Sequence, residues 1–460
     1  MSDSLQPATA LNIPPGEAIG RAHADYDQAR ALYNAMIDKK PRWIVRCADA
    51  GEVAAAIGYA REQGLVLAVR GGGHNGAGLG SCDDGVVIDL SQKKAVQVDP
   101  LARTVRVEPG CTQGDVERAT SPYGLTVPAG VVSTTGIAGL ALGGGHGYLS
   151  RLHGLTIDNL IEAEVVLADG RIVQASADEN PDLLWGLKGG GGNFGVVTSF
   201  LFRAHPVTDV YAGPIFWDIT DAPEIMLWYR DFLPRAPRAL CPFLSLQTVP
   251  SCDPFPREIW GRHACALISV YEGSQAEGEA AMAPVRAALP TPLIDGMMQV
   301  PFADFQAAFD ALLPAGLQWY WKGDFVDELS DDAISTHLEY AARAPSPQSL
   351  MHLYPIDGAV QDVGEAETPW GARGATWSMV IAGIDPNPAK AAELKRWAGD
   401  YWSAVHAFNR HGGAYVNFMA GDEGQARVRA AYGANYERLV ALKRKWDPEN
   451  LFRVNQNIVP

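Results

Sequence analysis

The chain has 460 residues, more than one ordinary hydrophobic core accommodates, so two domains are expected. Hydrophobic residues make up 47% and charged residues 20%, which is the balance of a globular protein with sizeable cores. The formal net charge of -16 argues against a general nucleic-acid binder, because such proteins gain affinity largely by neutralising phosphates.

The N-terminal segment and the cysteines bear on location. Residues 1–18 contain neither a positively charged segment nor a continuous apolar one, so no signal peptide is expected, and no later stretch is long enough to span a bilayer. We therefore expect a cytoplasmic protein with neither membrane nor nucleic acid as a partner. Because no C-x-x-C pair and no zinc-ligand spacing occurs, we expect no metal site, and free thiols at Cys47, Cys82, Cys111, Cys241, Cys252 and Cys265.

An α/β pattern opens the chain. Residues 43–47 predict a strand, and the Asp49-x-x-Glu52 spacing of a capping box predicts a helix that begins at Asp49. Residues 65–69 then predict a second, buried strand.

A glycine-rich stretch follows at 70–80. Its G-x-G-x-x-G spacing from Gly71 matches the letters of the Rossmann dinucleotide fingerprint, which must open a helix. Gly76, Gly78 and Gly80 would each cost a helix about 1 kcal/mol relative to alanine. We therefore expect a loop between strands, whose backbone N–H groups are open to a bound anion.

Strand signals continue towards residue 200. Short apolar runs at 86–90, 95–98 and 104–108 are separated by turn-prone residues and predict adjacent strands. Asp169-Gly170 lies between two further apolar runs and predicts a β-hairpin, because Asp-Gly readily supplies the positive φ angles of a type I′ turn. These features are typical of one α+β unit.

The character of the chain changes after residue 207. Proline-rich connections join long aromatic-bearing runs that predict strands of a second sheet, at 241–249, 316–326 and 350–360. Helical patterns lie between these runs, at 276–289 and 332–344. The tail begins as an amphipathic helix at residue 436.

Glycines are concentrated in three clusters: Gly71–Gly73, Gly143–Gly145 with Gly147, and Gly189–Gly192 with Gly195. A single glycine loop is most often a tight turn. Three such loops in one domain favour several backbone segments that converge on a large, flat, phosphate-bearing ligand such as a dinucleotide.

Four segments together resemble a known family: RGGGHNGAGLG at 70–80, GIAGLALGGGHGYLSRLHGLTIDNL at 136–160, PDLLWGLKGGGGNFGVVTSF at 181–200, and the closing segment 415–460. In this order they are similar to the FAD-linked oxidases of the berberine bridge enzyme-like group, within the vanillyl-alcohol oxidase superfamily. The resemblance covers the two ends of the chain, while the middle matches only in general character.

The resemblance implies an α+β fold. A PCMH-type FAD-binding domain, split into two α/β subdomains, would be accompanied by a substrate domain of antiparallel sheet covered by helices. Residues 1–205 would begin the FAD-binding domain, residues 206–410 would form the substrate-binding domain, and residues 411–460 would return to the FAD-binding domain.

For the cofactor, the resemblance implies FAD joined covalently to His74. In the family this histidine is linked through a ring nitrogen to the 8α-methyl group of the isoalloxazine, and an electron-withdrawing link should make the flavin a stronger oxidant. Many members carry a second link from a cysteine, but that place falls at or near Val132, so we predict a single covalent bond. The alternative is that His74 only forms a hydrogen bond within its loop.

The resemblance also implies further cofactor contacts. Asp158 and Asn159 match a G-L-x-x-D-N motif that orders a loop near the cofactor, although helix capping explains them equally well. His146 and His153 do not have the spacing of a known metal-ligand set. The full set of predicted contacts, besides His74, is Arg70, Gly71, Gly72, Gly73, Asn75, Gly78, Thr134, Gly136, Gly139, Leu140, Gly143, Gly144, Gly147, Tyr148, Asp158, Asn159, Gly195, Val197, Asn417 and Asn455.

Two catalytic residues are implied, Thr135 and Tyr415. Thr135 falls at the family's oxygen-gating position, where small residues are typical of the oxidases. The alternative is an ordinary threonine before a helix.

Tyr415 and Asn417 match a Y-x-N segment, and a strand would put both side chains on one face. In related enzymes the tyrosine works as, or with, the catalytic base. Because the pKa of a phenol is ordinarily near 10, Tyr415 would need activation to accept a proton. The alternative is that Tyr415 is an ordinary core residue. Phe418 follows where the family often has a tyrosine.

The substrate wall is expected from the middle of the chain. Trp319 and Trp321 share one face of a predicted strand, with Tyr320 and Lys322 on the other. A second predicted strand carries His352 and Tyr354 on one face. One set should line the pocket, although aromatic stripes more often pack a core. The expected substrate contacts are Trp319, Trp321, His352 and Tyr354.

The implied activity is that of an FAD-dependent oxidase. It would take a hydride from a C–H next to a hydroxyl or amine to flavin N5, and reduce dioxygen to hydrogen peroxide. A dehydrogenase with another electron acceptor and a non-catalytic flavin-binding protein are the alternatives. The expected partners are a small-molecule substrate and dioxygen, and the chain could be a monomer or a homo-oligomer.

Overall fold

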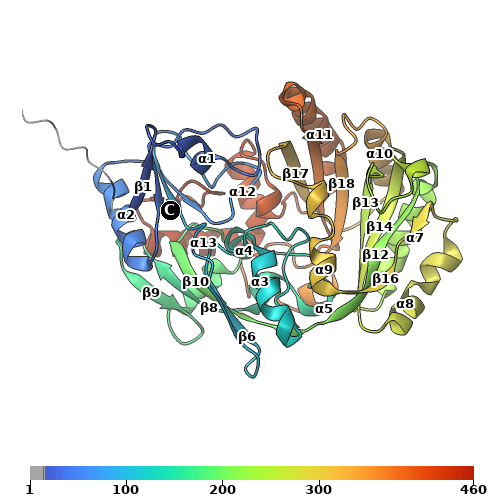
Figure 1. Cartoon of the computed structure of the whole chain (residues 1–460), viewed down its shortest axis with the longest axis horizontal. Helices are drawn as coiled ribbons and strands as arrows, with labels where there is room; N and C mark the ends of the chain where they lie inside the picture. The colour runs from blue at the N-terminus through green and yellow to red at the C-terminus, as the bar shows by residue number, and fades with distance from the viewer. Residues whose placement is uncertain (1–13, 15) are drawn as a thin grey trace, which may run out of the picture.

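Four β-sheets organise the part of the chain that this computed structural model describes, residue 14 and residues 16–460 (Figure 1). Most of the segment on which the signal-peptide expectation rests lies outside the described residues. Within them, no helix combines the length and the apolar character that crossing a membrane requires.

The first sheet has the strand order β1-β2-β4-β3. Its strands are β1 (Glu17–Gly20), β2 (Trp43–Arg46), β3 (Leu67–Arg70) and β4 (Val86–Asp89), and β4 runs parallel to β2 and β3. Helix α2 (Ala50–Glu62) connects β2 to β3, and the Asp49 side chain accepts the N–H of Glu52, as the sequence predicts. The Glu52 carboxylate accepts the N–H of Ala48 instead of that of Asp49, so only half of the capping box forms as predicted.

The second sheet has the order β5-β6-β10-β8-β9, and every pair is antiparallel. Its strands are β5 (Val96–Asp99), β6 (Thr104–Val107), β8 (Leu160–Val166), β9 (Ile172–Ala175) and β10 (Val196–Arg203). The predicted adjacency of the first three apolar runs is therefore wrong for β4, which lies in the first sheet. All four residues of β4 are buried, which suits the interior of a parallel sheet, whereas β5 alternates between half-buried and exposed residues.

The predicted hairpin is confirmed as β8 and β9, but its predicted type I′ turn is wrong. Gly170 donates its N–H to the carbonyl of Leu167, so Ala168 and Asp169 are the central residues of the turn. Among the described residues of this loop, only Gly170 has a positive φ, of +86°. The loop is therefore the longer kind, in which a single glycine takes the left-handed conformation.

An eight-stranded antiparallel sheet forms the other half of the molecule (Figure 1). Seven strands follow the order β15-β12-β14-β13-β18-β19-β17, and β16 also pairs with β12. The predicted strands at 241–249 and 316–326 are confirmed as β13 and β17. The predicted strand at 350–360 is confirmed as β18 only up to Pro355, because residues 358–360 form a 3₁₀ helix. The bounds are β12 (Asp209–Asp218), β13 (Leu240–Thr248), β14 (His263–Glu272), β15 (Ile294–Asp295), β16 (Met298–Pro301), β17 (Gln318–Val326), β18 (Leu350–Pro355) and β19 (Trp377–Asp385).

Helices cover one face of this sheet through a large buried cluster that includes Tyr229, Met282, Ile334 and Tyr401. The helices are α7 (Ala222–Phe232), α8 (Gln275–Ala288), α10 (Asp331–Ala341) and α11 (Ala391–His406), of which α8 and α10 confirm the two predicted helices. The opposite face meets the first half of the molecule, where Tyr148 packs with Phe243 and Tyr354.

The remaining short elements connect these sheets. They are α1 (Tyr26–Arg30), α3 (Gln113–Thr120), α4 (Ile137–Gly143), α5 (Ser150–His153), α6 (Pro181–Leu187), α9 (Phe302–Ala307), α12 (Gly424–Tyr432), α13 (Tyr436–Trp446), and the paired strands β7 (Leu125–Thr126) and β11 (His205–Pro206). Helices α12 and α13 lie back among the N-terminal elements (Figure 1).

A buried ion pair fixes this returning tail. The Lys443 ammonium donates to Asp447 at 2.7 Å and to the carbonyls of Asn193 and Phe452 at 2.7 and 2.9 Å. Both charged side chains are fully buried, so these bonds offset the cost of removing them from water. The tail is thereby held beside the third glycine cluster.

The hydrophobic core that contains α12 and α13 also includes Ile356, Trp370 and Ala375 from the middle of the chain.

Glu117 on α3 gives a test of this core. It is buried and accepts a bond from the Thr126 hydroxyl, and its burial raises the pKa of the carboxyl to about 7 from an ordinary 4.5. Since the unfolded chain releases this proton at lower pH, the folded state loses stability as pH rises from 4.5 to 7. We expect Glu117→Gln to match the wild type near pH 4.5 and to be more stable at pH 8 by about 2 to 3 kcal/mol, measured by urea unfolding.

Glu164→Gln is the matched control. Glu164 accepts an equivalent bond from Thr198 at 2.6 Å but is only half-buried. Its replacement should not reproduce the gain of about 2 to 3 kcal/mol at pH 8, because water still reaches this carboxylate and the cost of desolvation is smaller. Equal pH slopes for the Glu117→Gln variant and the wild type would contradict the prediction.

Candidate active site

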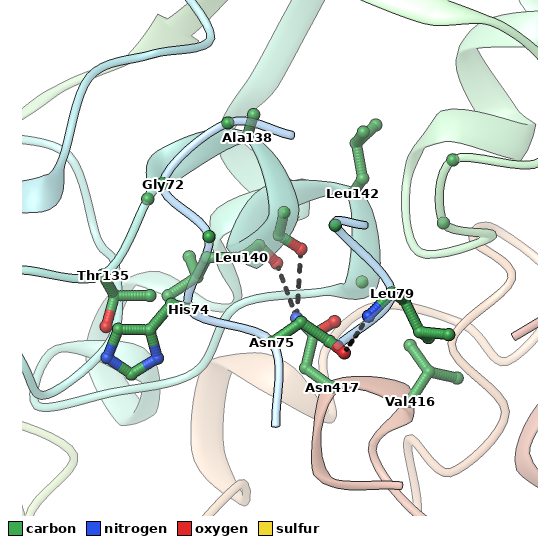
Figure 2. Close-up of a pocket in the computed structure, with 18 of the residues that line it drawn as sticks. Gly72, His74, Asn75, Leu79, Thr135, Ala138, Leu140, Leu142, Val416 and Asn417 are labelled. Carbon is green, nitrogen blue, oxygen red and sulfur yellow. Dashed lines mark hydrogen bonds between the residues drawn. The ribbon is translucent and has the colours of Figure 1, made fainter. Parts of the chain in front are cut away.

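A cavity of about 340 Å³ lies where the glycine clusters meet the aromatic face of the eight-stranded sheet. Its walls come from the loop after β3, the segment from Gly130 to His146, the third glycine cluster, strands β17, β18 and β19, and the returning tail. Figure 2 shows one part of this cavity, with His74, Asn75 and Leu79 from the first glycine loop and Val416 and Asn417 from the tail.

The first glycine loop runs from β3 directly to β4 without a helix in the described chain, which confirms the prediction and excludes a Rossmann turn. Gly72 packs against Gly136, and a Cβ on Gly72 would lie 2.6 Å from the Gly136 Cα. Only glycine allows this approach, which brings the loop to the start of α4. All three glycine clusters contribute residues to the cavity wall.

Arg70 is the one permanently charged side chain among the described residues that line the cavity. Its guanidinium donates to Asp89 at 2.7 and 3.3 Å, and both side chains are buried. Because Asp89 balances this charge, the cavity has no unpaired ionic group. A bound anion would meet backbone N–H groups and neutral side chains.

His74 lines the cavity and stacks on Tyr33, with ring centroids 3.8 Å apart. The residue is half-buried, but its Nε2 is buried and has no hydrogen-bond partner. Desolvation lowers the pKa of His74 to about 4, so the imidazole is neutral at ordinary pH. A neutral imidazole keeps a lone pair on one ring nitrogen.

Tyr415 and Asn417 lie at a tight turn, so the predicted strand is wrong. Tyr415 precedes the 3₁₀ helix η9 (Val416–Phe418), and the turn brings the two side chains together. The Tyr415 hydroxyl accepts the Asn417 amide N–H at 2.7 Å and the Gly145 backbone N–H at 3.1 Å. Burial raises the pKa of Tyr415 to about 12, while these two bonds lower it.

The aromatic wall contains the four residues named from the sequence. Trp319 and Trp321 line the cavity, and Tyr320 lies on the opposite face under the Lys395 ammonium, 5.3 Å from the ring centroid. His352 and Tyr354 also line the cavity and are joined by a bond of 2.6 Å between His352 Nδ1 and the tyrosine hydroxyl. Their contact with a substrate stays a prediction.

Most predicted cofactor contacts lie at the cavity, as do both predicted catalytic residues. The cavity-lining set is Arg70, Gly71, Gly72, Gly73, His74, Asn75, Thr135, Gly136, Gly139, Leu140, Gly143, Gly195, Val197, Tyr415, Asn417 and Asn455. Val132 also lines it, and none of the six cysteines does. All six thiols are free, as predicted.

The other predicted contacts, seven in all, lie outside the cavity lining: Gly78, Thr134, Gly144, Gly147, Tyr148, Asp158 and Asn159. Asp158 accepts the N–H of Leu155 at 2.8 Å and pairs with Arg373 at 2.6 Å, which supports the capping alternative. Asn159 donates to the carbonyl of Leu155. Tyr148 packs against Phe305 with its ring centroid 5.0 Å away.

The three glycines and the threonine among these seven residues contact other parts of the protein or solvent. A side chain on Gly144 would strike Trp370, and one on Gly78 would strike Ile37, so close packing explains both. Gly147 donates its N–H to Ser150. Thr134 is exposed, next to Thr135 at the cavity.

Several cavity residues carried no clear sequence signal. Tyr33 reaches His74 from the loop after α1, and Tyr432 and Gln456 bring buried polar atoms without partners. His146, considered above only as a metal ligand, also lines the cavity. His153 instead bonds to Glu272 at 2.7 Å. Within the described chain, no cluster of three or more His, Cys, Asp or Glu side chains is arranged to hold a metal ion.

Comparisons with known proteins agree on one family. A model described as FAD binding domain matches residues 41–176, and a model described as berberine and berberine like matches residues 414–459. An FAD-linked oxidoreductase of Dictyostelium discoideum is 30% identical over 439 residues, which cover 93% of this chain and 91% of the relative. An uncharacterized FAD-linked oxidoreductase of Bacillus subtilis (strain 168), YgaK, is 30% identical over 456 residues, 97% of each chain.

A solved structure shows the same fold. The crystal structure of 6-hydroxy-D-nicotine oxidase from Arthrobacter nicotinovorans superposes with a TM-score of 0.86 and 24% sequence identity. The match covers 98% of this chain and 100% of that one. The likeness therefore extends through the middle region, where the sequence resemblance is weakest.

Proposed function

Because the chain belongs to the berberine bridge enzyme-like family of FAD-linked oxidoreductases, we propose that it is a covalent flavoprotein oxidase. When bound, FAD would supply the oxidation: it takes a hydride from a substrate C–H next to a hydroxyl or amine, and dioxygen is reduced to hydrogen peroxide. The enzyme class and the predicted α+β fold with a PCMH-type FAD-binding domain follow from the family and from the superposition.

The observation that carries the proposal is the neutral imidazole of His74, which lines a glycine-walled cavity without a protein partner for Nε2. The surrounding residues fit a dinucleotide. Asn455 Oδ1 and Gln456 Nε2 are also buried at the cavity without partners, and glycines of all three clusters place backbone without side chains at the cavity wall.

His74 would hold the flavin by the only covalent bond. Val132, which lies where many relatives have a second attachment site, has no nucleophilic atom, and each cysteine is away from the cavity. The other cofactor contacts would come from the sixteen-member cavity-lining set named above, apart from the two catalytic residues. Trp319, Trp321, His352 and Tyr354 would face the substrate.

Tyr415 would assist removal of the proton from the substrate heteroatom. Asn417 and Gly145 donate hydrogen bonds to its oxygen and would stabilise negative charge there. These bonds oppose the desolvation that raises the pKa of Tyr415, so they provide the partial activation that the phenol needs.

An oxygen-consumption screen with purified yellow protein tests the proposal. Alcohols, sugars and cyclic amines should be tried, with hydrogen peroxide measured in parallel. A substrate that bleaches the flavin without air, followed by rapid recovery of the colour in air, is the expected result. Slow recovery would favour a dehydrogenase with another acceptor, and a flavin that no compound bleaches would favour a non-catalytic binder.

Thr135 is proposed to control access of dioxygen. It lines the cavity, and its backbone is fixed by bonds to Gln113 and Val132. We expect Thr135→Leu to slow reoxidation in air about tenfold or more, an increase of at least 1.4 kcal/mol in the barrier, because the larger side chain fills the path to the flavin. Stopped-flow absorbance would measure it.

Thr134→Leu is the matched control, since the adjacent threonine is exposed and outside the cavity. It should leave reoxidation unchanged. The gating role is wrong if both leucine variants reoxidise as fast as the wild type.

A further inference from the structure

His146 is a buried polar side chain at the cavity that the proposed function leaves unassigned. It follows α4 within the second glycine cluster and is only 5% exposed. It lines the cavity, and neither ring nitrogen has a hydrogen-bond partner. Buried polar groups are nearly always hydrogen-bonded in folded proteins, so two free nitrogens on a cavity wall indicate a position for a ligand atom.

Aromatic rings surround this imidazole. The ring centroids of Tyr415, Tyr354 and Phe418 lie 4.8, 5.1 and 5.3 Å from that of His146. Trp370 lies at 6.4 Å, edge to face. These five residues form what we call the aromatic box, an apolar space with a single unengaged imidazole.

Trp370 Nε1 is also buried without a partner, but Trp370 lies outside the cavity lining. The two hydroxyls of the aromatic box are already engaged. The Tyr415 hydroxyl accepts bonds from Asn417 and Gly145. The Tyr354 hydroxyl is bonded to His352. A ligand oxygen that enters the box therefore finds its free hydrogen-bonding partner at His146.

Charge narrows the kind of ligand. Desolvation lowers the pKa of His146 to about 3, so its ring is neutral and offers one donor and one acceptor. The charge of Arg70 is already balanced by Asp89. A carboxylate or an ammonium group in the box would lose its water without gaining a counter-charge, which costs several kcal/mol. A sugar would bury many hydroxyls for few partners.

We propose that His146 anchors the substrate by a hydrogen bond to a hydroxyl or carbonyl oxygen, and that the substrate is an uncharged alcohol with a flat, apolar body. This inference rests on the proposed function and deepens it. It selects alcohols over amines, which are cations at neutral pH, and over oligosaccharides. His146 is a specificity-determining residue in this assignment, since it holds the oxygen next to the reacting carbon.

Binding of naphthalene derivatives to the flavin-containing protein tests the proposal. 2-Naphthol is uncharged, and the carbon that bears its hydroxyl has no hydrogen to lose, so it binds without turnover. Equilibrium dialysis would compare it with naphthalene, 2-naphthoate and 2-naphthylmethylammonium. We expect 2-naphthol to bind about tenfold more tightly than naphthalene, because of one added hydrogen bond, and more tightly than both ions by about tenfold or more.

Substitutions assign the preference to one side chain. His146→Phe keeps a flat ring without nitrogens and should bind 2-naphthol no better than naphthalene. His146→Gln keeps a donor and an acceptor and should retain part of the preference. His337→Phe is the matched control: His337 is equally buried, its Nδ1 is bonded to Tyr401 at 2.8 Å, and it lies outside the cavity, so its variant should keep the full preference.

Thermal melting and flavin content would show that each variant is folded. The proposal is overturned if the His146→Phe variant keeps the tenfold preference, if either ion binds to the wild type as tightly as 2-naphthol, or if no probe binds to it. Failure of the proposed function gives a different result: purified protein without flavin, or with flavin that no substrate reduces.

Discussion

Replacing His74 by alanine should release the flavin from the polypeptide. Acid-precipitated wild-type protein should be yellow, whereas His74→Ala should precipitate colourless and leave all pigment in the supernatant. The reason is chemical: in the proposed function His74 would supply the nucleophilic nitrogen at the cavity, and none of the six cysteines lies there to replace it. Absorbance of the pellet after denaturation, with mass spectrometry of the intact chain, measures the link.

Asn75→Ala is the control on the same loop. Asn75 also lines the cavity, and its Oδ1 accepts the Leu79 N–H at 3.1 Å (Figure 2). Its removal disturbs the loop but not the link, so the pellet should stay yellow. A yellow pellet from the His74→Ala protein would place the attachment elsewhere, and a colourless wild-type pellet would favour the alternative in which His74 only forms a hydrogen bond.

Removing the Tyr415 hydroxyl should have the largest effect on catalysis. We expect Tyr415→Phe to slow anaerobic flavin reduction by about 10²- to 10⁴-fold, the usual contribution of a positioned proton-transfer group. Asn417→Leu should cause a smaller loss, because it removes one of the two bonds that lower the pKa of Tyr415. Since that pKa is about 12, the phenolate fraction and the reduction rate should rise with pH between 6 and 9 in the wild type.

Tyr148→Phe is the matched control for this loss of a hydroxyl. Tyr148 is buried outside the cavity and donates to the carbonyl of Val131 at 3.3 Å. Its variant should reduce flavin at the wild-type rate and with the same rise with pH. Wild-type reduction by the Tyr415→Phe protein would remove Tyr415 from the mechanism and leave it as a core tyrosine.

The sequence alone identified the features that depend on local order. The cap at Asp49, the loop after β3 and the hairpin around Gly170 each depend on neighbouring residues, so the local sequence was enough to predict them. The same holds for the aromatic strands β17 and β18, where the alternation of side chains placed Trp319 and His352 on the faces that line the cavity. The family motifs indicated the FAD-linked class for the same reason.

What only the tertiary structure decided are the relations between distant segments. Asp158 was expected at the cofactor, but it pairs with Arg373, 215 residues away, and no local pattern encodes such a partner. Strand β4 pairs in parallel with β2 and β3, so both of its edges are hydrogen-bonded within the first sheet, and all four of its residues are buried. The role proposed for His146 could not be predicted from the sequence, because Tyr354 and Tyr415 come from separate parts of the chain. Only the tertiary structure packs them against an imidazole whose nitrogens have no hydrogen-bond partner. Local geometry follows from adjacent residues, whereas burial and pairing depend on which surfaces the whole chain brings together.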